Sequence, residues 1–505
     1  MKNSLVALAA LGFLLLLRPS PAQAAPQVQS EAELFGAPAA PKVDVKKETK
    51  DQPTNPRTES EMQKSPVNEG IDAARQKQTE EKPAVVDRYA SELIDKMQIG
   101  GRLELRGQSN KVDDQRYQQS PYNQNKTADI YFDTRPNKDT RAFLRLRFYE
   151  DNSARAQSQP QSQETVTSTE KTGVSSIEES IDELWLKWDI EDTVFVTAGK
   201  QHVKWGRGRF WNPTDFTATE AKDPFALFDR RLGQEMIKIH LPFEKSGHNL
   251  YAIAELDDTH RNDDVGLALR GEFSVGSNGE TAISLYSKRG KPLKLGLDLG
   301  IGFGNFDINT ETAFLTRDDT PRYEGDLDIA KLQVPTAQFD HKNVYNQSVL
   351  NIEYIWKYND DDNVTFGLEG FWNGLGYDTR TLEFYSLLQN QSKILYAGKQ
   401  YIAGYARLPT PGDWNETTFI FNAVQNLSDN TVLTRLTATY LFYKQITAEA
   451  YISRCFGDYG ELCFRVPEKI VQGAPAFPAS TQAIIAALPK KTTRTVFGGS
   501  LSMNF

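Results

Sequence analysis

The chain has 505 residues and a formal net charge of −9, so it is long enough for one large domain or about three ordinary ones. The acidic balance argues against a general nucleic-acid-binding protein, which would carry an excess of Lys and Arg. A hydrophobic content of 39% is low for a bundle of membrane helices, and no stretch offers about 18 uninterrupted apolar residues.

The N-terminus is a predicted secretory signal peptide over residues 1–24. Lys2 supplies the positive charge, residues 5–17 form an apolar run, and residues 22–24 read A-x-A, which is a cleavage motif. The run is too short to span a membrane as a helix. An exported chain of this composition would therefore enter a membrane only as a β-barrel.

Residues 25–84 are rich in Pro, Ala, Gln, Lys and Glu and nearly free of aromatic side chains. Such a segment cannot bury enough apolar surface to fold, so we expect a disordered periplasmic tether. Apolar residues then recur at helical spacing, which predicts a short helix over residues 85–97. We expect this helix to dock at the mouth of the next domain, and an oligomerising or cell-wall-contacting element is the alternative.

From residue 98 to residue 505 apolar residues recur at every second position, which is the period of a β-strand. This pattern predicts an all-β domain built as a transmembrane antiparallel barrel of about 18 strands, with 16 as the alternative. The predicted strands cover residues 98–108, 127–135, 141–149, 180–189, 193–201, 233–242, 248–257, 264–275, 279–288, 292–303, 306–316, 346–358, 363–372, 398–407, 416–425, 431–442, 445–454 and 494–505.

The lengths of the predicted connections support a barrel. If the first strand runs outward, every even-numbered gap falls at the periplasmic end, and these gaps are short. The long gaps all fall at the other end, near residues 109–126, 150–179, 202–232, 317–345, 373–397 and 455–493. Bacterial outer-membrane barrels segregate their connections in this way, whereas a soluble β-sandwich has no reason to do so.

The two faces of the predicted strands differ in polarity. In residues 292–303 the side chains of Leu293, Leu295, Leu297 and Ile301 share one face, and Asp298 lies on the other. A charge on the lipid face costs roughly 2–4 kcal/mol near the middle of a bilayer, so the charged face should line the interior. Aromatic residues near the predicted strand ends, such as Trp356, fit the interfacial girdles of membrane barrels.

Arginines gather on the predicted inner face of the first three strands, where they alternate with acids of the neighbouring strand. They are Arg102, Arg106, Arg141, Arg145 and Arg147. Two interpretations stay open. The charges could neutralise one another, or they could form a wall that orients a passing solute, because fixed charge in a lumen selects ions.

The third long gap is the most distinctive stretch. Residues 199–231 combine many cations with many aromatic rings, and a loop this aromatic is expected to be buried, at roughly 25 cal/mol per Å² of apolar surface. The candidate pore-lining residues in this loop are Lys204, Trp205, Arg207, Arg209, Trp211, Arg230 and Arg231. Pure bracing of the barrel wall is the alternative role.

Two motifs carry a resemblance to a known family. The pattern G-K-Q-x-x-x-W-G-x-G-x-F-x-N-P-x-D at residues 199–215 resembles a motif of porin-like Gram-negative outer-membrane proteins. The last strand, TVFGGSLSMNF, alternates apolar residues and ends in Phe505, which resembles the closing strand of such barrels. The resemblance implies recognition by the barrel-assembly machinery, and a third outer loop (residues 202–232) that folds inward as a constriction.

Other chemistry finds little support in the sequence. Cys455 and Cys463 lie close together in an exported chain, which predicts a disulfide. The five histidines have no metal-ligand spacing, and GIGFGN at residues 300–305 lies inside a strand pattern rather than before a helix. We therefore predict no enzyme activity, no catalytic residues, no metal and no cofactor.

The sequence thus predicts an outer-membrane, porin-like channel for small hydrophilic or organic solutes. Its expected partners are outer-membrane lipid, the assembly machinery and the solutes, without nucleic acid. Two alternatives stay open: a polysaccharide export barrel, and a plugged structural barrel whose tether contacts the cell wall or a partner. The identity of the solute and the oligomeric state do not follow from the sequence.

Overall fold

The computed structural model describes residues 97–112, 122–151, 177–218, 222–226, 231–257, 264–316, 321–327, 333–339, 342–360, 362–389, 391–465 and 492–505, and six isolated positions between them (220, 259, 261, 472, 475 and 482). The predicted signal peptide, the tether and the helix over residues 85–97 lie outside these residues, except for Met97, which begins the first strand.

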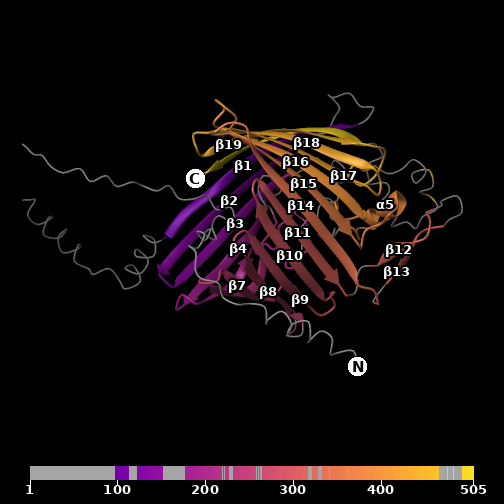
Figure 1. Ribbon diagram of the computed structural model, residues 1–505. Coiled ribbons are helices and arrows are strands. Elements are labelled where there is room, and N and C mark those ends of the chain that lie inside the picture. Colours follow the sequence, from indigo (N-terminus) through magenta and orange to yellow (C-terminus); the bar gives the residue numbers. More distant parts are fainter. Residues whose placement is uncertain are drawn as a thin grey trace, which may run out of the picture. The chain divides into compact units, whose positions relative to one another are not determined.

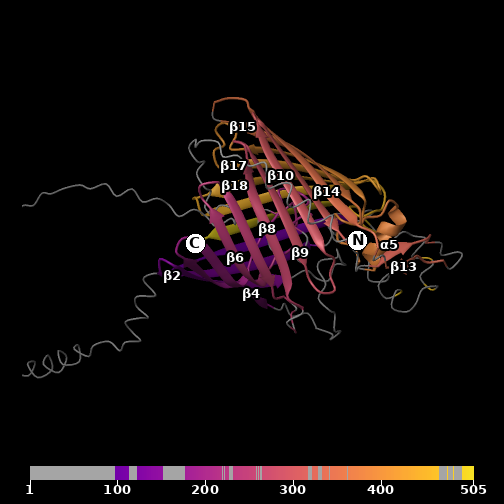
Figure 2. The same cartoon turned by 60° about the horizontal axis from the view of Figure 1, so that its bottom comes forward.

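Eighteen antiparallel strands form one sheet that closes on itself (Figures 1 and 2). The sheet is closed because β1 pairs with β2 on one side and with the last strand, β20, on the other. The strands of this barrel are β1 (Met97–Val112), β2 (Tyr122–Asn137), β3 (Thr140–Asp151), β4 (Ile177–Ile190), β5 (Val194–Gln201), β6 (Gln234–Phe243), β7 (His248–Glu255), β8 (Gly266–Val275), β9 (Gly279–Ser287), β10 (Lys294–Phe303), β11 (Phe306–Leu315), β14 (Tyr345–Lys357), β15 (Asn363–Asn373), β16 (Gln400–Pro409), β17 (Thr417–Asn426), β18 (Thr431–Phe442), β19 (Ile446–Phe456) and β20 (Thr493–Asn504). Each predicted strand is present, and the number is 18 rather than 16.

The connections differ in length at the two ends of the barrel, as the sequence predicted. Short turns join β2 to β3, β4 to β5 and each later pair of this parity, and the chain ends at the same end. We call this the short-turn end. The opposite end carries the connections over residues 202–233, 316–344, 374–399 and 457–492, and we call it the long-connection end.

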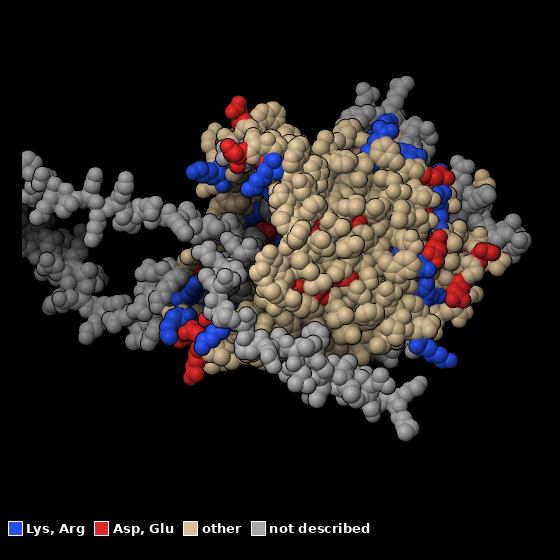
Figure 3. Space-filling model, viewed as in Figure 1, with Lys and Arg blue, Asp and Glu red and all other residues tan. Residues whose placement is uncertain are grey.

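The outer surface of the barrel is apolar. Leu267, Leu269 and Leu350 are each about half exposed on its outside, whereas Asp298 and Asn351 are buried on the inner face. Figure 3 shows the result, a broad area almost free of charged side chains between two charged ends. This surface suits the hydrocarbon region of a membrane, where charge is costly.

Aromatic side chains mark the edge of the apolar area at the short-turn end. Trp356, Tyr358, Tyr440, Phe442 and Tyr443 lie there with exposed rings. Rings with one apolar and one polar side favour the boundary between lipid and water.

The last strand closes the barrel, as predicted. The backbone N–H of Phe505 donates to the carbonyl of Gly101 at 3.0 Å, and the N–H of Gly101 donates back to Phe505 at 2.9 Å. Phe497, Leu501 and Phe505 are exposed on the outer face of β20. These contacts leave no free edge between the first and the last strand, which satisfies the backbone groups inside a membrane.

Three short elements in the long connections were missed by the sequence analysis. They are β12 (Arg322–Glu324), its partner β13 (Thr336–Gln338) and the helix α5 (Arg380–Leu388). Elements this short carry too few periods of apolar residues to be recognised. Within the described part of the chain, no helix is long and apolar enough to cross a membrane.

The helix α5 packs on the connection over residues 457–492, which a disulfide ties to β19. Phe384 of α5 is buried, and its ring stacks on that of Phe464 at 5.5 Å. The predicted disulfide between Cys455 and Cys463 is present and ties the end of β19 to the following connection. These contacts stabilise the long-connection end around the mouth of the barrel.

A cluster of buried acids joins α5, the connection after β19 and the turn between β17 and β18. Asn426 donates to Glu383 at 2.8 Å and to Glu461 at 2.9 Å, and the backbone N–H of Glu461 donates to Asp429 at 2.6 Å. Burial raises the pKa of Glu461 to about 7. Burial, with the nearby charges of Asp429 and Glu461, raises the pKa of Glu383 to about 10.

The acid cluster predicts that the long-connection end loosens as the pH rises. Both folded pKa values lie above the usual value of a glutamate, so the protonated forms of these two acids stabilise the folded long-connection end. This stabilisation is complete below the usual pKa of a glutamate and is lost as the pH rises from that value through the folded pKa values. Hydrogen exchange of the α5 amides, corrected for the intrinsic rate, should show less protection at about pH 9 than at about pH 5. In Glu461→Gln the part of this change that is complete near pH 7 should disappear, and protection that rises with pH would contradict the assignment.

Candidate functional site: the inner loop

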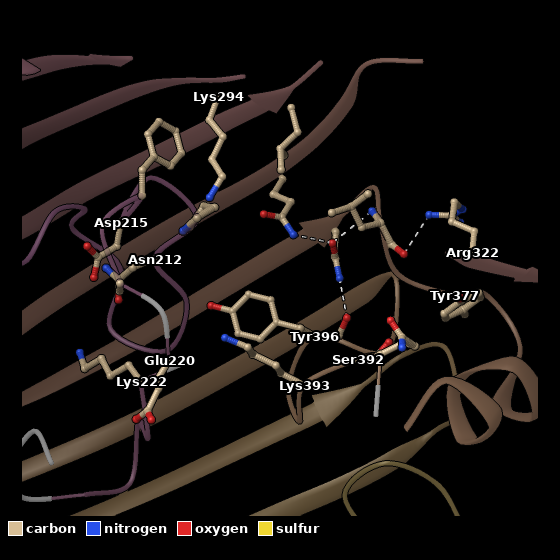
Figure 4. Close-up of a pocket in the computed structure, with 18 of the residues that line it drawn as sticks. Asn212, Asp215, Glu220, Lys222, Lys294, Arg322, Tyr377, Ser392, Lys393 and Tyr396 are labelled. Atoms are coloured by element: carbon tan, nitrogen blue, oxygen red, sulfur yellow. Dashed lines mark hydrogen bonds between the residues drawn. The ribbon is translucent and has the colours of Figure 1, made fainter. Parts of the chain in front are cut away.

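The third long connection, residues 202–233, contacts side chains of the barrel's inner face, and we call it the inner loop. It leaves β5 and returns to β6, yet its backbone hydrogen-bonds to acids of β11 and β15, far along the sheet. Figure 4 shows part of this loop with Asn212 and Asp215 beside the wall. The contacts therefore join distant strands across the interior.

Glu369 of β15 holds three consecutive backbone amides of the inner loop. The N–H groups of Arg209, Phe210 and Trp211 donate to its carboxylate at 2.7, 3.0 and 2.9 Å. Asn351 donates to the same carboxylate at 3.0 Å. Glu369 is fully buried, and hydrogen bonds to a charged acceptor are stronger than neutral ones, so this is a specific anchor.

Glu311 of β11 is a second anchor of the same kind. It accepts the backbone N–H groups of Arg207 and Gly208 and the hydroxyl of Thr214, the last at 2.9 Å. Its side chain is 1% exposed. Glu311 thus binds the loop on both sides of residues 209–213, and Glu369 binds the amides of residues 209–211 between these contacts.

Glycines of the loop motif permit these close approaches. Gly206 has a φ of +85°, which a residue with a side chain rarely adopts. A Cβ on Gly208 would lie 2.0 Å from the carbonyl oxygen of Trp211, so no side chain fits there. The spacing W-G-x-G therefore lets the backbone turn its N–H groups toward the acids.

Aromatic rings of the loop fill an apolar part of the inner wall. Trp211 is fully buried, stacks on Phe371 at 5.3 Å and donates its indole N–H to the carbonyl of Leu395 at 2.9 Å. Phe210 packs beside it against Tyr405. Burial of a large apolar side chain contributes roughly 1.5–3 kcal/mol, so these rings add to the anchoring by the acids.

A second apolar cluster holds the beginning of the loop. Trp205 and Phe216 pack with Met236, Ile253 and Tyr286 of the neighbouring strands, and all five are buried. The guanidinium of Arg270 lies over the Trp205 ring at 5.5 Å. This side of the inner wall is therefore covered rather than open to water.

Asp182 of β4 binds both ends of the inner loop. His202 at its start lies 3.2 Å from one carboxylate oxygen, and the backbone N–H of Gly233 at its end donates to the Asp182 carbonyl at 3.1 Å. Asp182 is fully buried, and Arg147 donates to it at 2.9 Å. The roots of the loop are fixed to the same wall that carries the predicted arginines.

A cavity of about 290 Å³ lies between the inner loop and the connection over residues 374–399. Five of the residues that line it are cations and two are acids. The cations are Lys222, Arg231, Lys294, Arg322 and Lys393, and the acids are Asp215 and Glu220. In Figure 4 Lys222, Lys393 and Lys294 surround this space, with Tyr396 between the strands and the loop. The excess of positive charge favours anionic groups in the cavity.

Burial shifts the pKa of two groups in this cavity. It lowers the pKa of Lys393, while Glu220 acts in the opposite direction. Burial also raises the pKa of Asp215, against the effect of Arg231, which lies 3.3 Å away.

The predicted loop cations have different surroundings. Lys204 is exposed, and Arg207 donates to Glu280 at 2.5 Å. Arg209 lies over the ring of Tyr405 at 4.1 Å. Arg231 borders the cavity and pairs with Asp215, whereas Arg230 lies outside the described residues.

The predicted wall arginines lie on the inner face and form ion pairs. Arg102 and Arg106 both contact Glu104, at 3.0 and 3.1 Å, and Arg106 also lies 3.5 Å from Glu449. Their side chains are 17% and 14% exposed.

The arginines of β3 are paired in the same manner. Arg141 contacts Asp133 at 2.8 Å, and Arg145 contacts Glu183 at 3.1 Å. Arg147 bridges to Asp129 and Asp182, both at 2.9 Å. Mutual neutralisation, one of the two interpretations left open by the sequence, thus applies to each of these arginines.

The sequence analysis did not select Glu311 or Glu369, although they hold the inner loop. Both are inward-facing acids next to inward apolar residues, Ala313 and Phe371 respectively. An inward acid directly beside an inward apolar residue was the available signal. Among the described residues, no group of three or more His, Cys, Asp or Glu side chains could hold a metal ion.

The chain is similar to several solved structures, at low sequence identity. No protein-family model and no curated protein matches the sequence. Among solved structures the chain is similar to the outer membrane protein opdK of Pseudomonas aeruginosa, with 7% identity and a TM-score of 0.44 over 81% of this chain and 99% of that one. It is also similar to OccAB1 of Acinetobacter baumannii (7%, 0.45, 81% and 96%) and to a mutant of the Rhodopseudomonas blastica porin (10%, 0.37, 81% and 100%).

Similarities at this level carry no information about a solute. The closed 18-stranded antiparallel barrel follows from the strand pairings themselves.

The two acid anchors predict a release of the inner loop on mutation. Glu311→Gln with Glu369→Gln places amide N–H groups against backbone N–H groups, so residues 205–214 should become accessible to limited proteolysis. We expect a loss of about 2–4 kcal/mol of local stability from the pair of substitutions.

A matched control is available for this experiment. Glu449 is an equally buried inner-face glutamate, but it pairs with Arg435 at 2.7 Å on the wall of β18 and β19. In Glu449→Gln the inner loop should stay protected. Equal cleavage in both variants would contradict a specific role for the two anchors.

Proposed function

We propose that this chain is a channel in the outer membrane of a Gram-negative bacterium, through which small hydrophilic or organic solutes diffuse. The inner loop narrows the passage, and the remaining free path runs along the wall that carries the paired arginines. The apolar exterior, the aromatic side chains at its edge and the polar interior support a membrane location.

The anchoring of the inner loop carries this proposal. Glu311, Glu369 and two buried aromatic clusters fix residues 205–216 against the inner wall. A loop held this firmly inside a barrel reduces its cross-section without depending on a partner. The side chains of Arg141 and Arg145 on the opposite wall keep about 30% of their surface exposed, as expected beside water.

Conductance in planar bilayers tests the proposal. The intact chain should conduct ions, and the variant with Glu311→Gln and Glu369→Gln should show a larger or less stable conductance, because its loop is released. Glu244→Gln, in the exposed turn between β6 and β7, serves as the control and should resemble the intact chain. A silent intact chain that conducts only after loop release would favour the plugged structural barrel.

Solute size separates the channel from the export barrel. Liposome swelling should be rapid with monosaccharides and amino acids and should decline steeply with solute size. Passage of long polysaccharides at a comparable rate would contradict a narrowed pore and favour export.

The cationic cavity predicts a preference for anions. Reversal potentials in a salt gradient should shift toward anion selectivity in the intact chain, and Lys222→Gln with Lys393→Gln should reduce that shift. Lys245→Gln, in the exposed turn at the short-turn end, is the control. The same reversal potential in all three proteins would contradict a selective role of the cavity.

A further inference from the structure

The disulfide between Cys455 and Cys463 closes a short ring of the chain at the long-connection end, and we call residues 455–463 the disulfide ring. The ring begins at the end of β19, and both cysteines are buried. Glu461 of the ring is 3% exposed, and Leu462 packs against the apolar cluster that contains rings of the inner loop. The disulfide ring therefore reaches the residues that hold the inner loop in place.

Glu461 binds the disulfide ring to two strands and to the connection over residues 374–399. Its carboxylate accepts the hydroxyl of Tyr401 at 2.8 Å and the side-chain amide of Asn426 at 2.9 Å. It also accepts the backbone N–H of Ala397 at 3.1 Å. Removal of this acceptor would leave three buried donors without a partner, which is costly, so the contact is specific.

Tyr401 connects Glu461 to the inner loop. Its hydroxyl donates to Glu461, while its ring packs on Trp211 at a centroid distance of 5.5 Å. Tyr401 is 2% exposed and Trp211 is fully buried. Side chains in a close-packed interior do not move independently, so a displacement of Glu461 changes the contacts of the Trp211 ring.

Leu395 provides a second connection. Its backbone carbonyl accepts the indole N–H of Trp211 at 2.9 Å. Its φ is +69°, a left-handed conformation that is unfavourable for a leucine and persists only where the surrounding structure holds it. Ala397, two residues further along the chain, is bound to Glu461 and helps to hold this segment. The carbonyl that receives Trp211 is thus oriented through the disulfide ring.

We propose that the disulfide ring sets the position of the inner loop, with Glu461 as the positioning residue, so that the width of the passage depends on oxidation of the two cysteines. A cross-link between residues so close in sequence removes most of the conformations open to the chain between them, which returns Glu461 to one place. The inner loop stays attached through Glu311 and Glu369 in either state, so its position shifts without release.

The chemical step is an ordinary thiol–disulfide exchange. The thiols of Cys455 and Cys463 give two electrons and two protons to an oxidised disulfide reagent or protein, an S–S bond forms, and the oxidant becomes a dithiol or two thiols. A thiol–disulfide oxidant of the compartment outside the cytoplasm is therefore the implied partner during folding. The inference deepens the proposed channel function, and its consequence for conductance rests on that function.

Exchange of the Trp211 indole hydrogen tests the proposal without requiring conductance. It is measured by NMR on the full chain in detergent micelles, and Trp211→Phe identifies the signal. Refolding with dithiothreitol instead of oxidised glutathione should make this exchange about tenfold faster, as expected for the loss of one or two hydrogen bonds. The double variant with Cys455→Ser and Cys463→Ser should exchange equally fast under both conditions.

Variants of Glu461 separate its role from that of the cross-link. Glu461→Ala keeps the disulfide but removes the acceptor, so the Trp211 indole should again exchange about tenfold faster, and Glu461→Gln should restore most of the protection. The matched control is Asp458→Asn in the same ring, whose side chain is 58% exposed and contacts Arg380 and Arg465. It should exchange as the intact chain does, because exposed ion pairs contribute little.

The outcomes distinguish this inference from the channel function. Faster exchange of the α5 amides with unchanged exchange of the Trp211 indole, on reduction or in Glu461→Ala, would overturn the proposal, because the ring would then stabilise only the outer connections. In planar bilayers the reduced chain should show a larger or less stable conductance than the oxidised chain. An indole that responds in a protein that does not conduct would contradict the channel function alone.

Discussion

Closure of the sheet between β1 and β20 is the constraint on which the rest of the structure depends. In hydrocarbon every backbone N–H and C=O must find a partner within the protein, and only a closed sheet provides one for each strand. Closure also divides the side chains strictly between lipid and interior. The outside of the barrel must be apolar, so all chemistry is confined to the inner face and to the connections.

The inner face has two parts, one that the inner loop covers and one that is charged and partly exposed. Along β6 to β9 and β14 to β17 it carries apolar residues such as Met236, Val349 and Val424, which would be unfavourable in contact with water. The inner loop supplies the matching aromatic rings, and Glu311 and Glu369 supply acceptors for its backbone. Along β1 to β4 the inner face is instead charged and partly exposed, with each arginine beside a carboxylate. The loop and the wall that it covers therefore form a unit, whereas the side chains of the wall arginines stay partly exposed.

Much of this fold could be predicted from the sequence, because a membrane barrel repeats one simple rule. A period of two over residues 98–505 and turns of alternating length were enough to place all 18 strands and the closing strand. The partners within the barrel could not be predicted. Arg141 and Asp133 lie on neighbouring strands, so the pairing register of the two strands could have placed them side by side. Glu369 lies about 160 residues from Phe210, and no local sequence pattern relates the two. The helix α5 and the hairpin of β12 and β13 were too short for their periods to be recognised.

The pairing of the wall arginines also changes what the arginines can do. An unpaired arginine in a lumen attracts anions over a long range, whereas an arginine held by a carboxylate acts mainly as a hydrogen-bond donor at short range. In this chain the net positive charge lies in the cavity at the long-connection end. On the inner face that carries the wall arginines, positive and negative charges nearly cancel. Long-range attraction and short-range recognition are thus separated along the axis. Under the proposed channel function, selectivity for ions and recognition of neutral solutes would therefore depend on different residues.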